Sequence, residues 1–174
     1  MAPMNKKARM EYKGRKFELD WIKDSEFEKY KPIIQVYGII YDKNMNVLIG
    51  RKNSEKPWAL MGGTPEEGEE VLGTLERELI EEADVTFKNP VLLGVQRVVE
   101  VDDEGNSIGK PFYQSRVVAE IDQVLEQTED PDKGTVWERK FVPIDEAEDY
   151  LKWGQAAVAM IEDAKEIIEA ALKK

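Results

Sequence analysis

Short runs of β-branched, aromatic and other apolar residues, separated by polar turns, occupy most of the chain. Runs of this kind predict β-strands, because branched side chains pack well on a pleated surface. The predicted strands cover residues 33–41, 47–51, 91–101, 111–121 and 135–142. Ahead of them, the turn Lys13-Gly14-Arg15 separates two short segments with apolar residues, which predicts a β-hairpin over residues 11–22.

Two other segments have helical periodicity. Over residues 69–82, apolar residues recur at spacings of three and four, which predicts one apolar stripe along a helix: Leu72, Leu75, Leu79 and Ala83. A second stripe predicts a helix over residues 156–172, with Val158, Ile161, Ala164, Ile168 and Leu172 on one side. Gly62, Gly63 and Pro65 favour a loop before the first of these helices.

Strands on both sides of an internal helix, followed by a helix at the end, favour an α+β fold in which a mixed sheet lies between helices. The length of 174 residues suits one domain, and no long linker divides the chain. We expect residues 1–30 to form an N-terminal extension and residues 31–174 to form the main domain.

Composition excludes several classes of site. The chain has no cysteine and no histidine, which rules out disulfides, thiolate catalysis, histidine metal sites and a Ser-His triad. Its formal net charge of −11 makes nonspecific binding to nucleic acid or to an anionic membrane unfavourable. No apolar run approaches the length that spans a membrane, so we expect a cytoplasmic protein.

Three glutamates, Glu78, Glu81 and Glu82, share one arc of the first predicted helix. Like charges at these spacings repel one another, so the cluster is unfavourable unless something neutralises it. A hard divalent cation such as Mg²⁺ prefers oxygen ligands and would neutralise the cluster. The alternative is an acidic helix face that is merely solvated.

The spacing of residues around this cluster carries more information than the cluster does. The fixed positions are Gly63, Glu69, Arg77-Glu78-Leu79, Glu81-Glu82 and Val85. They resemble the Nudix box, G-x5-E-x7-R-E-U-x-E-E-x-G-U, in which U is a bulky aliphatic residue. Asp84 stands where the box has glycine. Asp tolerates the left-handed region better than most residues, so we expect Asp84 to occupy a positive-φ turn and Asp84→Gly to be neutral or slightly stabilising.

The resemblance covers roughly residues 33–171 and implies a Nudix hydrolase with the α/β/α sandwich of that family. It implies hydrolysis of the pyrophosphate linkage of a nucleoside diphosphate joined to another moiety, with Mg²⁺ or Mn²⁺. By the same resemblance Glu78, Glu81 and Glu82 are the metal-binding and basic carboxylates, and the Gly63 carbonyl is a further ligand. Catalytic Arg77 pairs with Glu69 and orients the carboxylates. An additional acid would come from the loop before the last strand, where Asp132 and Glu138 are the candidates.

The substrate is not defined by the sequence. Neither Glu100 nor Val101 is the proline that the family's ADP-ribose hydrolases carry downstream of the box, and the tyrosine of its dinucleoside polyphosphate hydrolases is missing as well. Candidate substrate contacts are Arg51, Tyr113 and Arg116. Two alternatives remain at this stage: a nucleotide-binding sensor without turnover, and a homodimer formed through residues 1–30 and the last helix.

Overall fold

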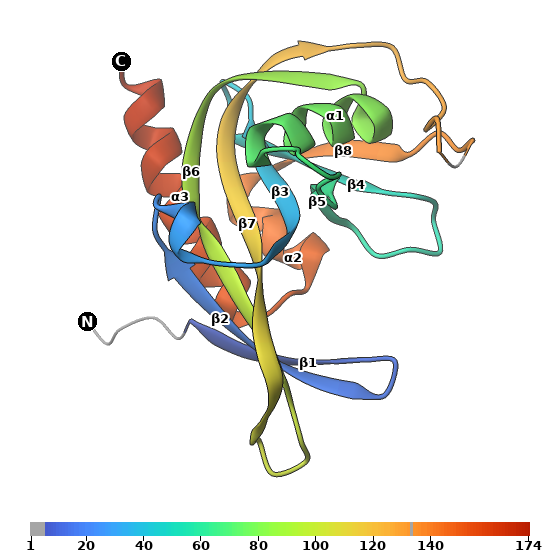
Figure 1. Cartoon of the computed structure of the whole chain (residues 1–174). Coiled ribbons are helices and arrows are strands. Elements are labelled where there is room, and N and C mark those ends of the chain that lie inside the picture. Colours follow the sequence, from blue (N-terminus) through green and yellow to red (C-terminus); the bar gives the residue numbers. More distant parts are fainter. Residues whose placement is uncertain (1–5, 133) are drawn as a thin grey trace.

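The computed structural model describes residues 6–132 and 134–174. Its strands and helices follow one another along the chain as labelled in Figure 1. They are β1 (Lys7–Tyr12), β2 (Arg15–Lys23), a 3-10 turn (Phe27–Lys29), β3 (Ile33–Tyr41), β4 (Asn46–Arg51), β5 (Ala59–Gly63), α1 (Val71–Ala83), β6 (Val85–Val101), β7 (Ser107–Val124), β8 (Glu138–Pro143), a second 3-10 turn (Ile144–Glu146), α2 (Ala147–Leu151) and α3 (Gln155–Leu172).

The strands of the described residues form one sheet, ordered β1-β2-β6-β7-β3-β5-β4-β8. Strands β3 and β7 run parallel, and the other neighbouring pairs are antiparallel. The long hairpin of β6 and β7 contains several register shifts and extends below the rest of the sheet in Figure 1. The sheet is therefore mixed, as the sequence predicts.

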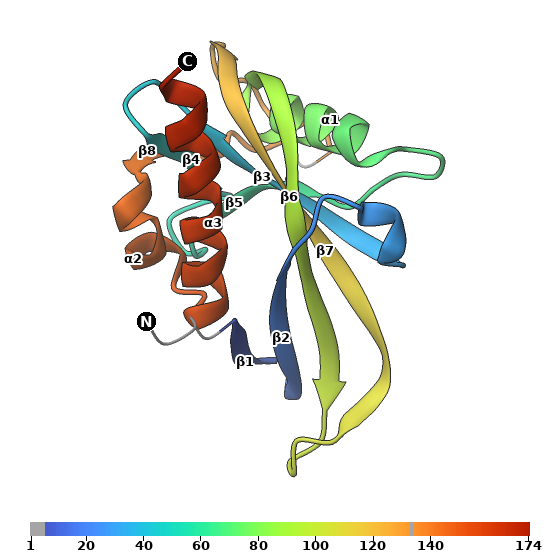
Figure 2. The same ribbon diagram turned by 90° about the vertical axis from the view of Figure 1, so that its left-hand side faces the viewer.

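An apolar core lies on each face of this sheet. Leu75 and Leu79 of α1 are fully buried against one face. Ile161, Ala164 and Ile168 of α3 are buried against the other, together with residues of α2. Figure 2 shows α1 on one side of the strands and α2 and α3 on the other. This arrangement confirms the predicted α+β fold with a mixed sheet between helices.

Several predicted elements are shifted. Helix α1 begins at Val71, and Leu72 of the predicted stripe is exposed. Thr74 is buried in its place, because its hydroxyl donates to Glu69 Oε1 at 2.6 Å. Strands β6 and β7 are longer than predicted, whereas the last strand begins only at Glu138.

Gly62 and Gly63, expected in a loop, are the last two residues of strand β5. A Cβ atom at Gly62 would collide with the carbonyl oxygen of Val36 on the neighbouring strand β3. Gly62 therefore allows a close approach between two backbones rather than a turn.

Residues 7–23 form an antiparallel hairpin, turned at Lys13 and Gly14, and its second strand is hydrogen-bonded to β6. Trp21 of β2 is buried, and its Nε1 donates to Asp163 Oδ2 of α3 at 2.7 Å. The N-terminal segment is thus joined both to the sheet and to the last helix. None of the described helices is long and apolar enough to cross a membrane.

Candidate active site

Glycine at position 63 brings strand β5 and helix α1 into direct contact. A Cβ atom on Gly63 would overlap the carboxylate of Glu78, which lies directly against this backbone. The Glu78 side chain is only 13% exposed. The close packing of the Gly63 backbone against Glu78 therefore fixes the position of the first carboxylate of the cluster.

Arg77 connects the start of the box to its end. Its Nε and Nη2 donate to the two carboxylate oxygens of Glu69 at 2.8 and 2.9 Å, and Nη2 also donates to the Thr64 carbonyl at 3.0 Å. This bidentate pair, with a further bond from Thr74, lowers the pKa of Glu69 to about 2. The pairing of Arg77 with Glu69 is the one that the resemblance implies.

The remaining guanidinium nitrogen of Arg77 holds the carboxylates of α1. Nη1 donates to Glu78 at 2.9 Å and to Glu81 at 3.3 Å. Burial raises the pKa of Glu81, while the Arg77 charge lowers it and the charges of Glu78 and Asp132 raise it. The third glutamate, Glu82, is half-buried one turn beyond Glu78.

A divalent cation fits the chemistry of these donors but not their present positions. Among the described residues, no three acidic side chains are close enough together to hold a metal ion. Arg77 Nη1 stands between Glu78 and Glu81 in this structure. The carboxylate oxygens and the Gly63 carbonyl are nevertheless the hard oxygen donors that Mg²⁺ and Mn²⁺ prefer.

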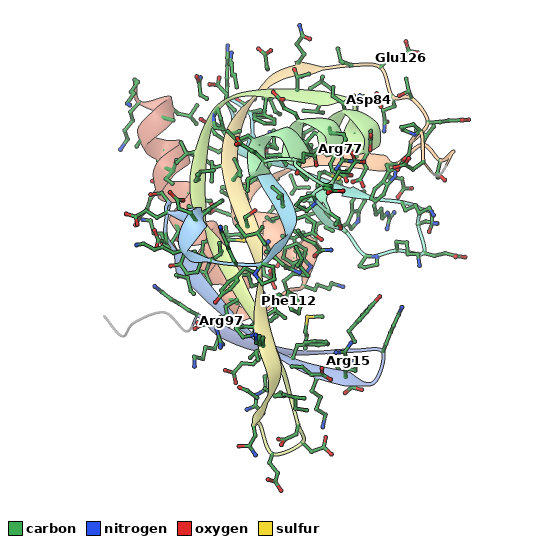
Figure 3. The ribbon with its side chains drawn as sticks, viewed as in Figure 1. Arg15, Arg77, Asp84, Arg97, Phe112 and Glu126 are labelled. Carbon is green, nitrogen blue, oxygen red and sulfur yellow. The ribbon has the colours of Figure 1, made fainter. Side chains whose placement is uncertain are left out.

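Asp84, at the end of α1, has φ 53° and ψ 45°, the left-handed conformation predicted for it. Its side chain also makes contacts that the expectation for Asp84→Gly did not include. Its two carboxylate oxygens accept hydrogen bonds from the backbone N–H and the hydroxyl of Thr128, both at 2.8 Å. Asp84 therefore fastens the loop of residues 125–137 to the box helix, and this loop carries Asp132 (Asp84 is labelled in Figure 3).

The structure places the other candidates apart from one another. Arg51 forms an ion pair with Glu138 and stacks on Trp58, with 4.3 Å from its guanidinium carbon to the ring centre. Tyr113 packs against Tyr30. Glu138 thus contacts Arg51 rather than the box carboxylates. The charge of Asp132, in contrast, raises the pKa of Glu81.

Arg116 is buried beside a cavity of about 620 Å³. Tyr37 lines the same cavity; burial raises the pKa of its phenol, and the charges of Glu82 and Glu78 add to this effect. Reasoning from the sequence missed the glutamines that surround Arg116: Gln35, Gln96 and Gln114. Their signal was a single glutamine inside each of three otherwise largely apolar strand segments.

Comparisons with known proteins show the family to which the chain belongs. The family model described as the NUDIX domain matches residues 31–163. An ADP-ribose pyrophosphatase of Methanocaldococcus jannaschii is 33% identical over 114 residues, which are 62% of this chain and 68% of that protein.

Solved structures resemble the chain as well. The MutT protein of Bacillus halodurans has a TM-score of 0.53 and 26% identity, over 71% of this chain and 77% of its own. A pyrophosphohydrolase of Bacillus subtilis has a TM-score of 0.63 over 91% of this chain and 96% of its own; at 16% identity it shows the fold alone. From the box, the fold and these matches together, the chain belongs to the Nudix family and is a pyrophosphohydrolase.

Proposed function

We propose that this protein hydrolyses the pyrophosphate linkage of a nucleoside diphosphate joined to another moiety, with Mg²⁺ or Mn²⁺. The observation that carries the proposal is the single guanidinium of Arg77, which joins Glu69, Glu78 and Glu81 beside the Gly63 backbone. ADP-ribose, named for the relative of Methanocaldococcus jannaschii, belongs to this class of substrate.

The carboxylates of Glu78, Glu81 and Glu82 and the Gly63 carbonyl would hold the cation. When bound, the cation neutralises charge on the pyrophosphate and activates water. The chain's own residues then have separate tasks. Glu69 keeps Arg77 in place through two hydrogen bonds, and Arg77 positions the carboxylates of α1. We assign the additional acidic position to Asp132 rather than to Glu138, which is paired with Arg51.

The division of the chain belongs to the same proposal. Residues 31–174 form the Nudix domain and residues 1–30 an extension, whose hairpin of residues 7–23 continues the sheet through the pairing of β2 with β6. The family model, which begins at residue 31, supports this boundary.

The test is hydrolysis of a panel of nucleotides and nucleotide sugars, ADP-ribose among them, with Mg²⁺, with Mn²⁺ and with excess chelator. Glu82→Gln should lower turnover by about 100-fold or more, because it removes a charged ligand and a candidate base. The matched control is Glu76→Gln, an exposed glutamate on the same helix at one of the variable positions of the box, which should keep wild-type turnover.

Full turnover in excess chelator, or an unimpaired Glu82→Gln protein, would contradict the proposal. Nucleotide binding without any turnover by the wild-type protein would instead support the sensor alternative. Thermal unfolding of each variant, with and without Mg²⁺, checks that the substitution has changed the site rather than the fold.

A further inference from the structure

Arg116 carries a buried charge whose hydrogen-bond partners are all neutral. Its guanidinium lies against the rings of Tyr37 and Trp153, which contact each other edge-on, with 5.0 and 5.6 Å from the guanidinium carbon to the ring centres. Burial lowers its pKa to about 10. Within the described residues, its hydrogen bonds go to the Ser115 carbonyl and to the amide oxygens of Gln96 and Gln114. A charge held in this way is not compensated by a carboxylate.

This arginine sets the direction of a chain of amides. Arginine has only donors, so the atoms that face it from Gln96 and Gln114 must be oxygens. The Gln114 nitrogen is then directed away and donates to Gln35 Oε1 at 2.7 Å. That bond in turn leaves the Gln35 nitrogen free to donate elsewhere. The orientation of all three amides therefore follows from chemistry and not from an arbitrary choice between oxygen and nitrogen.

The three glutamines stand in one row across neighbouring strands, since Gln114 of β7 is opposite both Gln35 of β3 and Gln96 of β6. All three line the cavity. Neither Gln35 Nε2 nor Gln96 Nε2 donates a hydrogen bond within the described part of the chain. The row thus presents two unused N–H donors to whatever enters the cavity.

The rest of the cavity suits a flat, mainly apolar group. Met10 and Tyr12 of β1 and Ile34 of β3 line it and are 43%, 56% and 37% exposed. Phe112 lines it from β7 (labelled in Figure 3). The described lining residues include cations, among them Lys152, and no carboxylate, although the protein has a net charge of −11. Apolar walls with a few convergent polar groups are typical of small-molecule sites.

We propose that this cavity binds the base of the substrate, and that its amide row selects bases with carbonyl edges over bases with amino edges. The inference rests on the proposed function, because Tyr37, which lines the cavity, is paired in the sheet with Gly62, next to Gly63 of the box that would act on the pyrophosphate. Each purine or pyrimidine pair differs at one exocyclic position, where guanine O6 and uracil O4 are carbonyl oxygens that accept from Gln35 and Gln96. Adenine N6 and cytosine N4 are amino groups at the same positions, and there a donor would face a donor.

The binding test uses GMP, UMP, AMP and CMP with the full chain in excess chelator, so that it does not depend on turnover. GMP should bind more tightly than AMP, and UMP more tightly than CMP, by about 10-fold each, the value of roughly one hydrogen bond. Equal affinities within either pair, or tighter binding of AMP and CMP, would overturn the proposal.

Gln35→Glu provides the sharper test. One carboxylate oxygen still accepts from Gln114, but the other now presents an acceptor where the wild type has a donor. The ratio of GMP to AMP affinity should fall by about 10-fold or more. The new negative charge also repels the phosphate of both nucleotides equally, so this repulsion leaves the ratio unchanged. Gln35→Leu should remove most of the preference without reversing it.

Tyr12→Ser is the matched control, because it alters an exposed apolar wall and leaves the amides unchanged. It should weaken the binding of all four nucleotides to a similar extent and leave the ratios of their affinities unchanged. The inference would be contradicted by a Gln35→Glu protein that circular dichroism shows to be folded and that keeps the wild-type ratio of GMP to AMP affinity. Hydrolysis by that protein would show that the proposed function stands independently.

Discussion

Asp84 shows how one departure from a family pattern can acquire a structural role. Its backbone conformation was predictable, because the motif position and the tolerance of Asp for the left-handed region are both local properties. Its partner was not predictable, since Thr128 is 44 residues further along the chain. A glycine has no side chain for that contact, so the loop of residues 125–137 is anchored here by chemistry that the family pattern lacks.

Asp84→Gly should destabilise the protein by about 1–3 kcal/mol. Two hydrogen bonds to a nearly buried carboxylate are lost, and the relief of the left-handed backbone offsets only part of that loss. Urea unfolding measures the change. Thr128→Val should cost a comparable amount, and the double variant should cost less than the sum. An additive double variant would show that the two side chains do not act through each other.

The lowered pKa of Glu69 predicts how the stability of the protein changes in acid. This pKa is lowered from 4.5 to about 2, mainly by the hydrogen bonds from Arg77. A group with a depressed pKa in the folded state stabilises the protein above the unfolded pKa. This contribution is complete above about pH 4.5 and is lost as the pH falls toward 2.

Stability to urea, measured at pH 6, 4 and 3, should therefore fall less steeply for Glu69→Gln than for the wild type. Exposed Glu67→Gln, two residues earlier, is the control and should follow the wild-type curve. Parallel curves for Glu69→Gln and wild type would mean that the Arg77 pair survives protonation of Glu69.

At the scale of elements, periodicity located the helices and the central strand well, because the apolar pattern that predicts each of them lies within its own residues. Strand β3 has the predicted bounds, and α3 begins one residue earlier than predicted. The sequence did not predict that Thr74, rather than Leu72, lies on the buried side of α1. This arrangement depends on the bond from Thr74 to Glu69, which lies before the helix and brings a polar residue into the interface. Strand β6 begins directly after Asp84 because pairing with β7 continues that far.

Trp21 is the contact through which β2 is fastened to α3. Trp21→Ala should cost about 3–5 kcal/mol, because it removes a large buried side chain and its hydrogen bond to Asp163. Trp21→Phe keeps most of the packing and should cost clearly less. Thermal and urea unfolding compare the two variants. A loss below about 1 kcal/mol for Trp21→Ala would show that the hairpin is held by its pairing with β6 alone.

At the scale of the whole molecule, the box could be identified from sequence and the cavity could not. The box lies within one short stretch, so its residues are brought together by one strand end and one helix. The cavity takes residues from β1, β2, β3, β6, β7 and the segment after α2. Their proximity results from the strand order β1-β2-β6-β7-β3, which no local pattern encodes. Arg116 was identifiable as a candidate, but its burial among amides and rings was not.

The hairpin of β1 and β2 lies outside the matched residues 31–163 and yet supplies part of the cavity wall. The segment that lines the proposed base site and the segment that carries the box are therefore separate stretches of the sequence. If the cavity has the role proposed for it, a library of variants confined to residues 7–23 would change which compounds are admitted while every residue from Gly63 to Val85 stays the same.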